Sequence, residues 1–122
     1  MAVVELNKDN FEQVINDNDF VIIDFWAPWC GPCRSFAPTY EKVSEDHANM
    51  VFAKLNTEDE QEIAGHFNIR SIPTLMIFRE KVIIFSQAGA LPEPAFRDLL
   101  QKASELDMAE VHRQVSEEQA QA

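Results

Sequence analysis

The chain has 122 residues, of which 46% are hydrophobic and 25% charged, as expected for one globular domain. Its 21 acidic and 10 basic residues give a formal net charge of −11, which argues against general binding to nucleic acid or anionic membranes. Two cysteines exclude a disulfide-scaffold mini-protein, and no apolar run approaches the ~18 residues of a membrane span. The first residues show no basic segment followed by a long apolar stretch, so we expect no secretory signal and a cytoplasmic protein.

The first half of the chain predicts two helices around one buried strand. Residues 7–10 offer helix N-caps, and apolar residues follow them at helical spacing. Residues 20–26 form an apolar run that only Asp24 interrupts, which predicts a strand buried on both faces. A helix is expected from about residue 30 to about residue 47, with a kink at Pro38.

The second half predicts a strand over 51–55, a helix over 58–67 and an antiparallel hairpin of residues 74–78 with 82–86. A last helix starts near residue 92, because proline is tolerated in a first turn. The apolar stripe of this helix consists of Phe96, Leu99, Leu100, Ala103 and Leu106. The order of the elements predicts an α/β fold, a mixed sheet with helices on both faces.

The main chemical signal is the pair Cys30 and Cys33, which encloses Gly31 and Pro32 and follows Trp29. Two intervening residues let both sulfurs meet across one turn, and proline suits the first turn of a helix. Cys30 is then expected at the helix N-terminus, where free N–H groups and the helix dipole favour a thiolate. A thiolate attacks disulfides, and Cys33, one turn later, can resolve the mixed disulfide.

The cysteine pair has two other interpretations. Structural zinc takes four ligands, and the spacing of His47, His66 and His112 does not match a zinc finger, so no metal site is expected. A purely structural disulfide over so short a loop would add little stability. Redox chemistry is therefore the preferred interpretation.

Asp24 is the second signal. In an extended strand it shares a face with apolar Phe20, Ile22 and Trp26, so its carboxyl should be buried and its pKa raised. A buried carboxyl six residues before Cys30 can relay a proton to or from the thiol pair. The alternative is an edge strand that leaves Asp24 in water.

Two further residues give weaker signals on their own. Lys54 shares a strand face with Phe52 and lies either near Asp24 or, like most lysines, at the surface. Pro73 stands at the start of a predicted strand, and most peptide bonds before proline are trans.

These segments together resemble the thioredoxin family. The matching pieces appear in order over about residues 3–106, and the set is far more specific than the cysteine pair alone. They are residues 24–33 (DFWAPWCGPC), Ala37-Pro38, residues 54–56 (KLN), residues 72–75 (IPTL) and Gly89-Ala90.

The resemblance implies a thioredoxin fold, with a central mixed sheet and helices on both faces. It implies that Cys30 is the nucleophile, Cys33 the resolving thiol, Asp24 the buried acid–base group and Lys54 its neighbour. It also implies a cis peptide bond before Pro73. The implied docking surface for substrate consists of Trp29, Gly31, Pro32, Ile72, Pro73, Gly89 and Ala90.

The implied activity is reduction of disulfides in protein substrates, with no bound cofactor because the dithiol holds the two electrons. The implied partner is an NADPH-dependent flavoprotein, thioredoxin reductase, and we expect a monomer. The Gly-Pro dipeptide between the cysteines favours a reductant, because histidine at that position accompanies the oxidising relatives. A non-catalytic binding module and an extracytoplasmic relative are the alternative functions.

The sequence departs from the family pattern at two places. The hairpin link is Arg79-Glu80-Lys81 where family members commonly have Asn-Gly, so we expect a longer or differently shaped turn.

The second departure is the tail of the chain. We divide the chain into a thioredoxin domain, residues 1–106, and an acidic helical tail, residues 107–122. The apolar stripe of the tail falls nearly opposite that of the preceding helix, so either the chain turns near residues 106–107 or the second stripe meets something else. That contact is expected to be a partner, a second copy or a neighbouring segment, and the alternative is a frayed, solvated end. The residues of this second stripe are Met108, Val111 and Val115.

Overall fold

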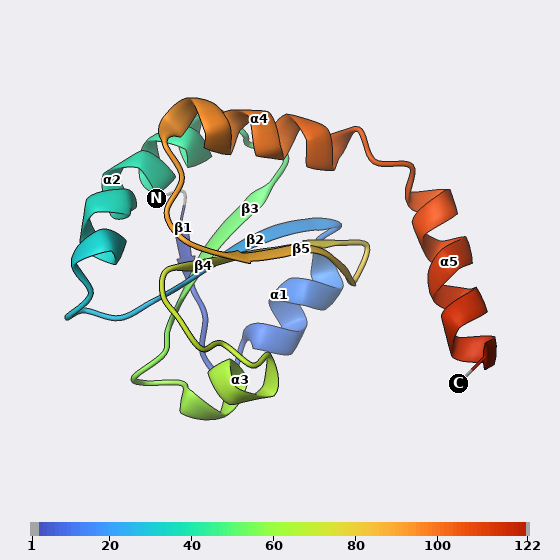
Figure 1. Cartoon of the computed structure of the whole chain (residues 1–122), viewed down its shortest axis with the longest axis horizontal. Helices are drawn as coiled ribbons and strands as arrows, with labels where there is room; N and C mark the ends of the chain where they lie inside the picture. Colours follow the sequence, from blue (N-terminus) through green and yellow to red (C-terminus); the bar gives the residue numbers. More distant parts are fainter. Residues whose placement is uncertain (1–2, 122) are drawn as a thin grey trace.

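The computed structural model describes residues 3–121 and contains ten elements. The strands are β1 (Val3–Glu5), β2 (Phe20–Trp26), β3 (Val51–Asn56), β4 (Thr74–Arg79) and β5 (Val82–Ala88). The helices are α1 (Phe11–Asp17), α2 (Gly31–Glu45), α3 (Gln61–His66), α4 (Glu93–Ser104) and α5 (Met108–Gln121). Figure 1 shows the first four helices around the sheet and α5 beyond one end of it.

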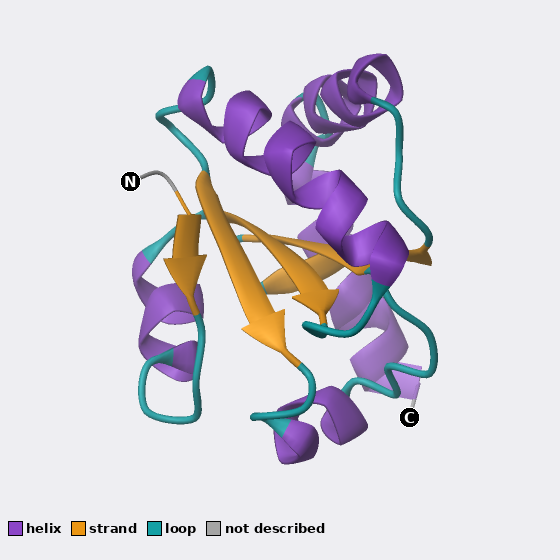
Figure 2. Ribbon diagram, turned by 90° about the vertical axis from the view of Figure 1, so that its left-hand side faces the viewer, coloured by secondary structure: helices purple, strands orange, loops and turns teal. Residues whose placement is uncertain are grey.

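The five strands form one mixed sheet in the order β1-β3-β2-β4-β5. β1 and β2 pair parallel with β3, whereas β2 with β4 and β4 with β5 are antiparallel. The strands fan out with the twist that is usual for such sheets (Figure 2). β2 is the central strand, which is why its residues are apolar on both faces and why an edge position for Asp24 is excluded.

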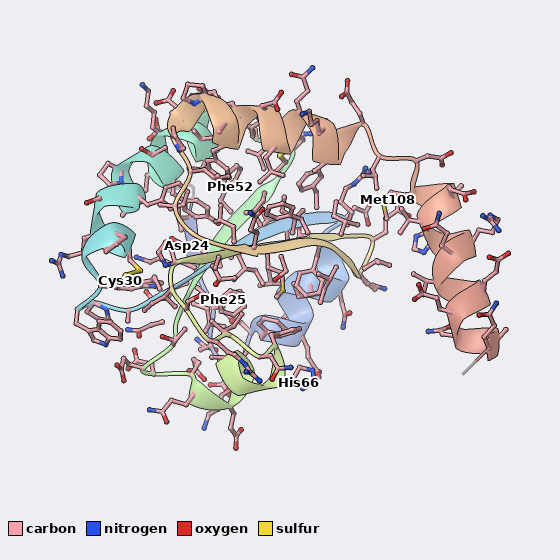
Figure 3. The ribbon with its side chains drawn as sticks, viewed as in Figure 1. Asp24, Phe25, Cys30, Phe52, His66 and Met108 are labelled. Atoms are coloured by element: carbon pink, nitrogen blue, oxygen red, sulfur yellow. A yellow bond between two sulfur atoms is a disulfide. The ribbon has the colours of Figure 1, made fainter. Side chains whose placement is uncertain are left out.

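One face of the sheet packs against α2 and α4. Alternate residues of the strands point into this core, because successive side chains of a strand face opposite sides. Figure 3 shows Phe52 of β3 on this side, under the two helices. The buried members of this core are Phe20, Ile22, Phe36, Tyr40, Val43, Met50, Phe52, Leu75, Ile77, Phe96, Leu100 and Ala103.

The opposite face packs against α1 and α3, and Phe25 of β2 points to this side (Figure 3). The buried members of this second core are Leu6, Ile15, Val21, Ile23, Phe25, Ala53, Leu55, Met76 and Phe78. The two cores together confirm the predicted α/β architecture, with helices on both faces of a mixed sheet.

Three of the differences from the sequence prediction concern β1, α3 and α4. β1 was not predicted, because three residues carry too little periodicity to signal a strand. α3 begins at Gln61 rather than at Glu58, because the Glu58 N–H is bound by the Asn56 side chain in a turn before the helix. α4 ends at Ser104, so Leu106 is 40% exposed and does not belong to the apolar stripe of that helix.

The expectation of a longer or differently shaped hairpin link is wrong. Arg79 pairs directly with Val82, so the loop has only two residues, Glu80 and Lys81. Their φ angles of 51° and 69° place both in the left-handed region, the pattern of a type I′ turn. Because neither residue is glycine, this turn is strained by about 1–2 kcal/mol for each residue and depends on surrounding contacts.

Those contacts come from the segment that joins α4 to α5. The Arg79 guanidinium donates hydrogen bonds to the carbonyl oxygens of Ala103, Ser104 and Leu106, and so caps the carboxyl end of α4. His112 Nε2 of α5 lies 2.9 Å from Glu80 Oε1 in the turn. The two departures from the family pattern therefore meet in space.

The chain turns between α4 and α5, which confirms the first of the two expected solutions for the tail. Met108 is buried, Val111 and Val115 are half-buried, and Met108 lies at the end of α5 that is next to the sheet (Figure 3). The residues facing away from the body of the protein are mostly polar. The division of the chain at residue 106 stays a prediction.

Candidate active site

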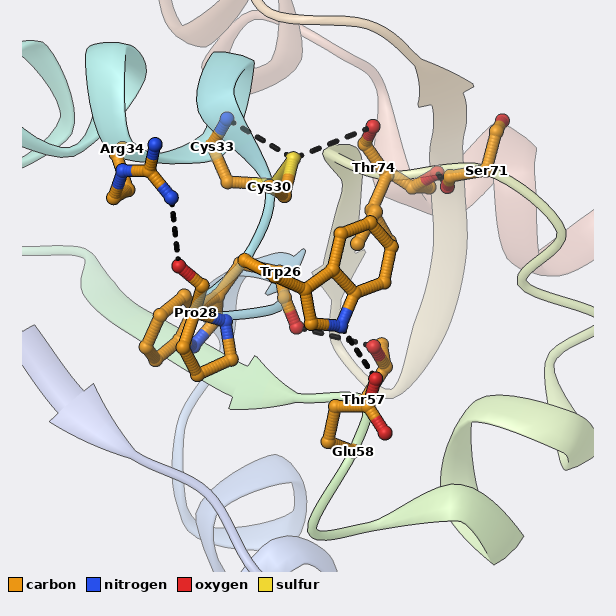
Figure 4. The surroundings of a disulfide bond; sticks show 11 residues. Trp26, Pro28, Cys30, Cys33, Arg34, Thr57, Glu58, Ser71 and Thr74 are labelled. Carbon is orange, nitrogen blue, oxygen red and sulfur yellow. Dashed lines mark hydrogen bonds between the residues drawn. A yellow bond between two sulfur atoms is a disulfide. The ribbon is translucent and has the colours of Figure 1, made fainter.

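The cysteine pair lies where β2 ends and α2 begins. Cys30 and Cys33 are joined by a disulfide, with their Cα atoms 5.2 Å apart (Figure 4). Cys30 is the N-cap residue of α2, and its sulfur accepts a hydrogen bond of 3.2 Å from the Cys33 N–H. Pro32, which lacks an N–H, occupies the first turn, where no helical partner exists for that group.

The position of Cys30 defines its electrostatics. In a helix N-cap the sulfur takes the place of the usual capping oxygen and faces the positive end of the helix dipole. After reduction of the disulfide, the same N–H groups favour a thiolate at Cys30. Both residues are buried, Cys30 with 5% and Cys33 with 2% of its surface exposed, so Cys30 is the more accessible of the two.

One loop lies against Cys30, and a second loop is hydrogen-bonded to the first. The Cys30 sulfur is 3.8 Å from the carbonyl oxygen of Ile72, and the Ile72–Pro73 peptide bond is cis, as the resemblance implies. The Gly89 N–H donates a 2.8 Å hydrogen bond to the Pro73 carbonyl. The φ of Gly89 is 109°, a left-handed conformation that favours glycine, and Ala90 follows it as an exposed residue.

The solvent side of the pair is formed by Trp29, Gly31 and Pro32. Trp29 is 66% exposed, which is unusual for so large a side chain, and its indole N–H donates to the Glu58 carboxylate. Gly31 is half-buried and Pro32 exposed.

Two residues that hold this loop, Glu58 and Arg34, were not predicted from the sequence. Glu58 was assigned to a helix, and nothing in the sequence indicated that its carboxylate would reach Trp29. Arg34 donates a 2.9 Å hydrogen bond to the Pro28 carbonyl and so ties α2 to the preceding loop. Neither contact could be predicted from the neighbouring sequence, because each is made by a long side chain that reaches another segment of the chain.

Asp24 lies beneath the disulfide in the middle of β2, with 4% of its surface exposed. It borders a cavity of about 90 Å³ that is large enough for several water molecules. Among the described residues, Asp24 Oδ1 has no hydrogen-bond partner. The cavity is also lined by Trp26, Cys33, Tyr40, Glu41 and Lys54, so it connects the buried carboxyl with the inner cysteine.

Burial raises the pKa of Asp24 from 3.8 to about 7, and the positive charge of Lys54 opposes part of this rise. Asp24 and Lys54 are register partners on β2 and β3. The Lys54 ammonium also lies 5.1 Å from the centre of the Trp26 ring, in a cation–π contact. The expectation that Asp24 is buried with a raised pKa is confirmed, and Lys54 lies near it rather than in open solvent.

Replacing Asp24 with asparagine should stabilise the protein in a pH-dependent way. Between about pH 4 and pH 7 the folded carboxyl keeps a proton that the unfolded chain has lost, so wild-type stability falls as the pH rises. At about 1.4 kcal/mol per pKa unit, this loss amounts to about 4 kcal/mol. Asp24→Asn lacks the titration, so its advantage in unfolding free energy should grow by up to about 4 kcal/mol from about pH 4 to pH 8.

Urea denaturation of the oxidised proteins at both pH values measures this difference. Asp98→Asn is the matched control, since Asp98 is an exposed carboxylate in an i,i+4 pair with Lys102. It should change stability little and similarly at each pH. If the difference in unfolding free energy between Asp24→Asn and the wild type does not vary with pH, Asp24 is not a buried carboxyl that titrates in this range.

The described residues 3–121 include no group of three or more histidine, cysteine or acidic side chains placed to hold a metal ion. None of the helices in this range combines the length and the apolar composition that crossing a bilayer demands.

Comparison with known sequences gives matches over nearly the whole chain. Residues 2–102 match the family model described as Thioredoxin. A Streptomyces coelicolor protein that carries the name thioredoxin 2 is 55% identical over 121 residues, which cover 99% of this chain and 90% of that protein. The thioredoxin of Pyropia yezoensis is 41% identical over 104 residues, covering 84% of this chain and 97% of that protein.

Solved structures give the same result. A mutant thioredoxin from Halobacterium salinarum superimposes with a TM-score of 0.79 at 30% identity, covering 86% of this chain and 93% of that one. Plasmodium falciparum thioredoxin superimposes with a TM-score of 0.75 at 33% identity, covering 84% and 98%.

Proposed function

This chain belongs to the thioredoxin family, and on that premise we propose that Cys30 is the nucleophile and Cys33 the resolving thiol of its disulfide exchange. The place of Cys30 supports this assignment, because Cys30 is the more exposed of the two residues and its sulfur accepts the Cys33 N–H in the first helical turn. Cys33 lies deeper, beside the cavity that leads to Asp24, and is suited to an intramolecular second step.

The protein is a thiol–disulfide oxidoreductase that reduces disulfides. In the proposed sequence, the Cys30 thiolate attacks one substrate sulfur, and the other substrate sulfur leaves and takes up a proton. The Cys33 thiolate then attacks the Cys30 sulfur, which releases the second substrate thiol. Two electrons and two protons pass to the substrate, and the Cys30–Cys33 disulfide that remains is the oxidised state seen here.

We assign the proton transfer at Cys33 to Asp24. Its pKa of about 7 suits a group that both takes up and releases protons near neutral pH. The carboxyl and the inner cysteine line one cavity that can hold water, which supports transfer through water rather than by direct contact. Lys54 lines the same cavity, and its charge limits the rise in the pKa of Asp24.

We assign substrate docking to the surface around Cys30. The Cys30 sulfur meets the loop of Ile72 and Pro73, and the Gly89 N–H ties a third loop to Pro73, so apolar groups and backbone surround Cys30. An extended substrate segment can lie across such a surface and bring its disulfide to Cys30. The proposed docking residues are Trp29, Gly31, Pro32, Ile72, Pro73, Gly89 and Ala90.

The family implies disulfide-containing substrates and a reductase that restores the dithiol. We propose that this reductase is an NADPH-dependent thioredoxin reductase, and that no bound cofactor takes part. We propose a monomer because Cys30, Cys33, Asp24 and Lys54 already meet within one chain, so the redox site needs no residue from a second copy. We propose a cytoplasmic location because a disulfide reductant needs a reducing compartment, and we propose no nucleic-acid or membrane partner because the net charge is −11.

The observation that supports this function most directly is the disulfide at the N-terminus of α2. It is tested by following NADPH consumption with a thioredoxin reductase and insulin as the disulfide substrate. We expect continuous oxidation of NADPH that depends on this protein. If the dithiothreitol-reduced protein reduces insulin but NADPH is not consumed, the proposed recycling partner is wrong. If neither reaction occurs, the proposed function is wrong.

Deleting residues 108–122 should leave insulin reduction unchanged, because α5 lies at the end of the sheet far from Cys30 (Figures 1 and 3). The deletion exposes the surface that Met108 covers, so we expect a loss of about 1–2 kcal/mol in unfolding free energy. His112→Ala, which removes only the contact with Glu80, is the milder control. A collapse of insulin reduction in a deletion variant that still folds contradicts a dispensable tail.

A further inference from the structure

We propose that the Tyr40 hydroxyl is a positioning group for the redox site, which holds α2 in register with the two strands that bear Asp24 and Lys54. This inference rests on the proposed function, because it assigns Tyr40 an effect on the proton transfer between Cys33 and Asp24. It adds a residue for which the sequence analysis found no role.

Tyr40 connects three elements through a single oxygen atom. Its hydroxyl lies 2.7 Å from the carbonyl oxygen of Ala53 and 3.0 Å from that of Ile22. Ala53 directly precedes Lys54 on β3, and Ile22 lies two residues before Asp24 on the same face of β2. One side chain of α2 thus reaches the backbone of both strands next to the two charged residues.

Tyr40 also lies on the same face of α2 as Cys33. The two residues are seven positions apart, which is about two helical turns. Both line the cavity that Asp24 and Lys54 border. A shift or rotation of α2 would therefore change the distance from Cys33 to Asp24, and the Tyr40 hydrogen bonds oppose that movement.

Packing alone does not require the hydroxyl. The Tyr40 ring stacks on Phe96 with centroids 5.7 Å apart and meets the edge of Phe52 at 5.4 Å. Phenylalanine would keep both contacts, and apolar packing is non-directional, so it holds the helix on the sheet without fixing its register. A fully buried hydroxyl is costly unless it is hydrogen-bonded, and this one uses its bonds to fix the helix.

The hydroxyl is not itself placed to transfer the proton. It has one hydrogen to donate, and the two backbone carbonyls accept it. Burial, and in addition the nearby Asp24 carboxylate, raise the pKa of Tyr40 well above 10, so it remains a donor. The other titratable or charged groups that line the cavity with Asp24 are Lys54 of β3 and Cys33, Arg34 and Glu41 of α2.

The test is Tyr40→Phe, which keeps the ring and removes only the hydroxyl. Without the Tyr40 hydrogen bonds, α2 should be held less firmly on β2 and β3, and more water should enter the cavity. The pKa of Asp24 should therefore fall from about 7 toward its ordinary value. NMR titration of the Asp24 carboxyl carbon in the oxidised protein measures this directly. The second readout is the rate at which reduced substrate is released near neutral pH, which should fall by about 2- to 10-fold.

Ser44→Ala is the matched control. Ser44 is a buried hydroxyl on the same helix, but it donates to the Glu41 carbonyl within α2 and reaches neither strand. It should lose stability as Tyr40→Phe does, yet leave the Asp24 titration and the release rate unchanged. Asp24→Asn provides the spectrum in which the carboxyl signal is absent, which identifies the resonance.

The outcomes separate this inference from the proposed function. An Asp24 titration that is the same in Tyr40→Phe and in the wild type overturns the role of Tyr40 while wild-type insulin reduction continues. An equal shift of the titration in Ser44→Ala also overturns it, because the effect would then follow from lost stability. Absence of insulin reduction by the wild type would instead contradict the proposed function.

Discussion

We expect Cys30→Ser to abolish insulin reduction, down to the rate seen without the protein. The hydroxyl that replaces the thiol cannot form a disulfide, and at neutral pH it is not ionised by the N–H groups that favour a thiolate at the start of α2. Cys33 cannot take over the first step, because only 2% of its surface is exposed. The NADPH-coupled assay, with the variant in excess of the reductase, measures the loss.

Ser35→Ala is the control for this experiment, since Ser35 is an exposed residue in the first turns of the same helix. It should retain wild-type turnover. Cys30→Ser with measurable residual cycling would show that Cys33 is reached by substrates, and the assignment of the two thiols would have to be reversed.

Cys33→Ser should retain the first step and lose the second. Cys30 still attacks the substrate, but resolution then depends on thiols from solution, so the mixed disulfide accumulates. Because an intramolecular thiol acts at an effective concentration far above millimolar, turnover should fall on the order of 10³-fold or more. Non-reducing gels should show a band of protein joined to substrate, which disappears with dithiothreitol.

The double variant with serine at both positions is the control for trapping. It keeps the docking surface but cannot form the covalent link, so no band should appear. If Cys33→Ser yields no trapped complex while the same gels detect the protein itself, Cys33 is not the resolving thiol.

The fold follows from sequence wherever local pattern and tertiary structure agree. The boundaries of β2 were predicted correctly, because seven residues bounded by turn formers and interrupted by one carboxyl leave few alternatives. The same interruption identified Asp24 as buried, since a carboxyl between apolar neighbours must face them. The cysteine spacing placed Cys30 at the start of α2, because Gly31 and Pro32 permit a turn and the helix after it.

What could not be predicted depends on contacts between distant segments. The hydroxyl of Tyr40 lies in an apolar helical stripe, and only the packing of α2 on β2 and β3 shows that it meets two carbonyls. The compact turn at Glu80 and Lys81 contradicts local preference, and tertiary contacts of Arg79 and His112 accompany it. The intrinsic conformational preferences of residues are a weak guide to backbone structure where such contacts offset local strain.

The position of α5 has a practical consequence. The carboxyl end of the described chain and the cysteine pair lie at opposite ends of the molecule (Figures 1 and 3). If the protein were attached to a chip, bead or electrode through a tag that follows α5, the cysteine pair of every molecule would therefore face the solution. The cysteine pairs in such an oriented layer could be reduced with dithiothreitol and oxidised again by disulfide substrates, and the attachment point would not block access to them.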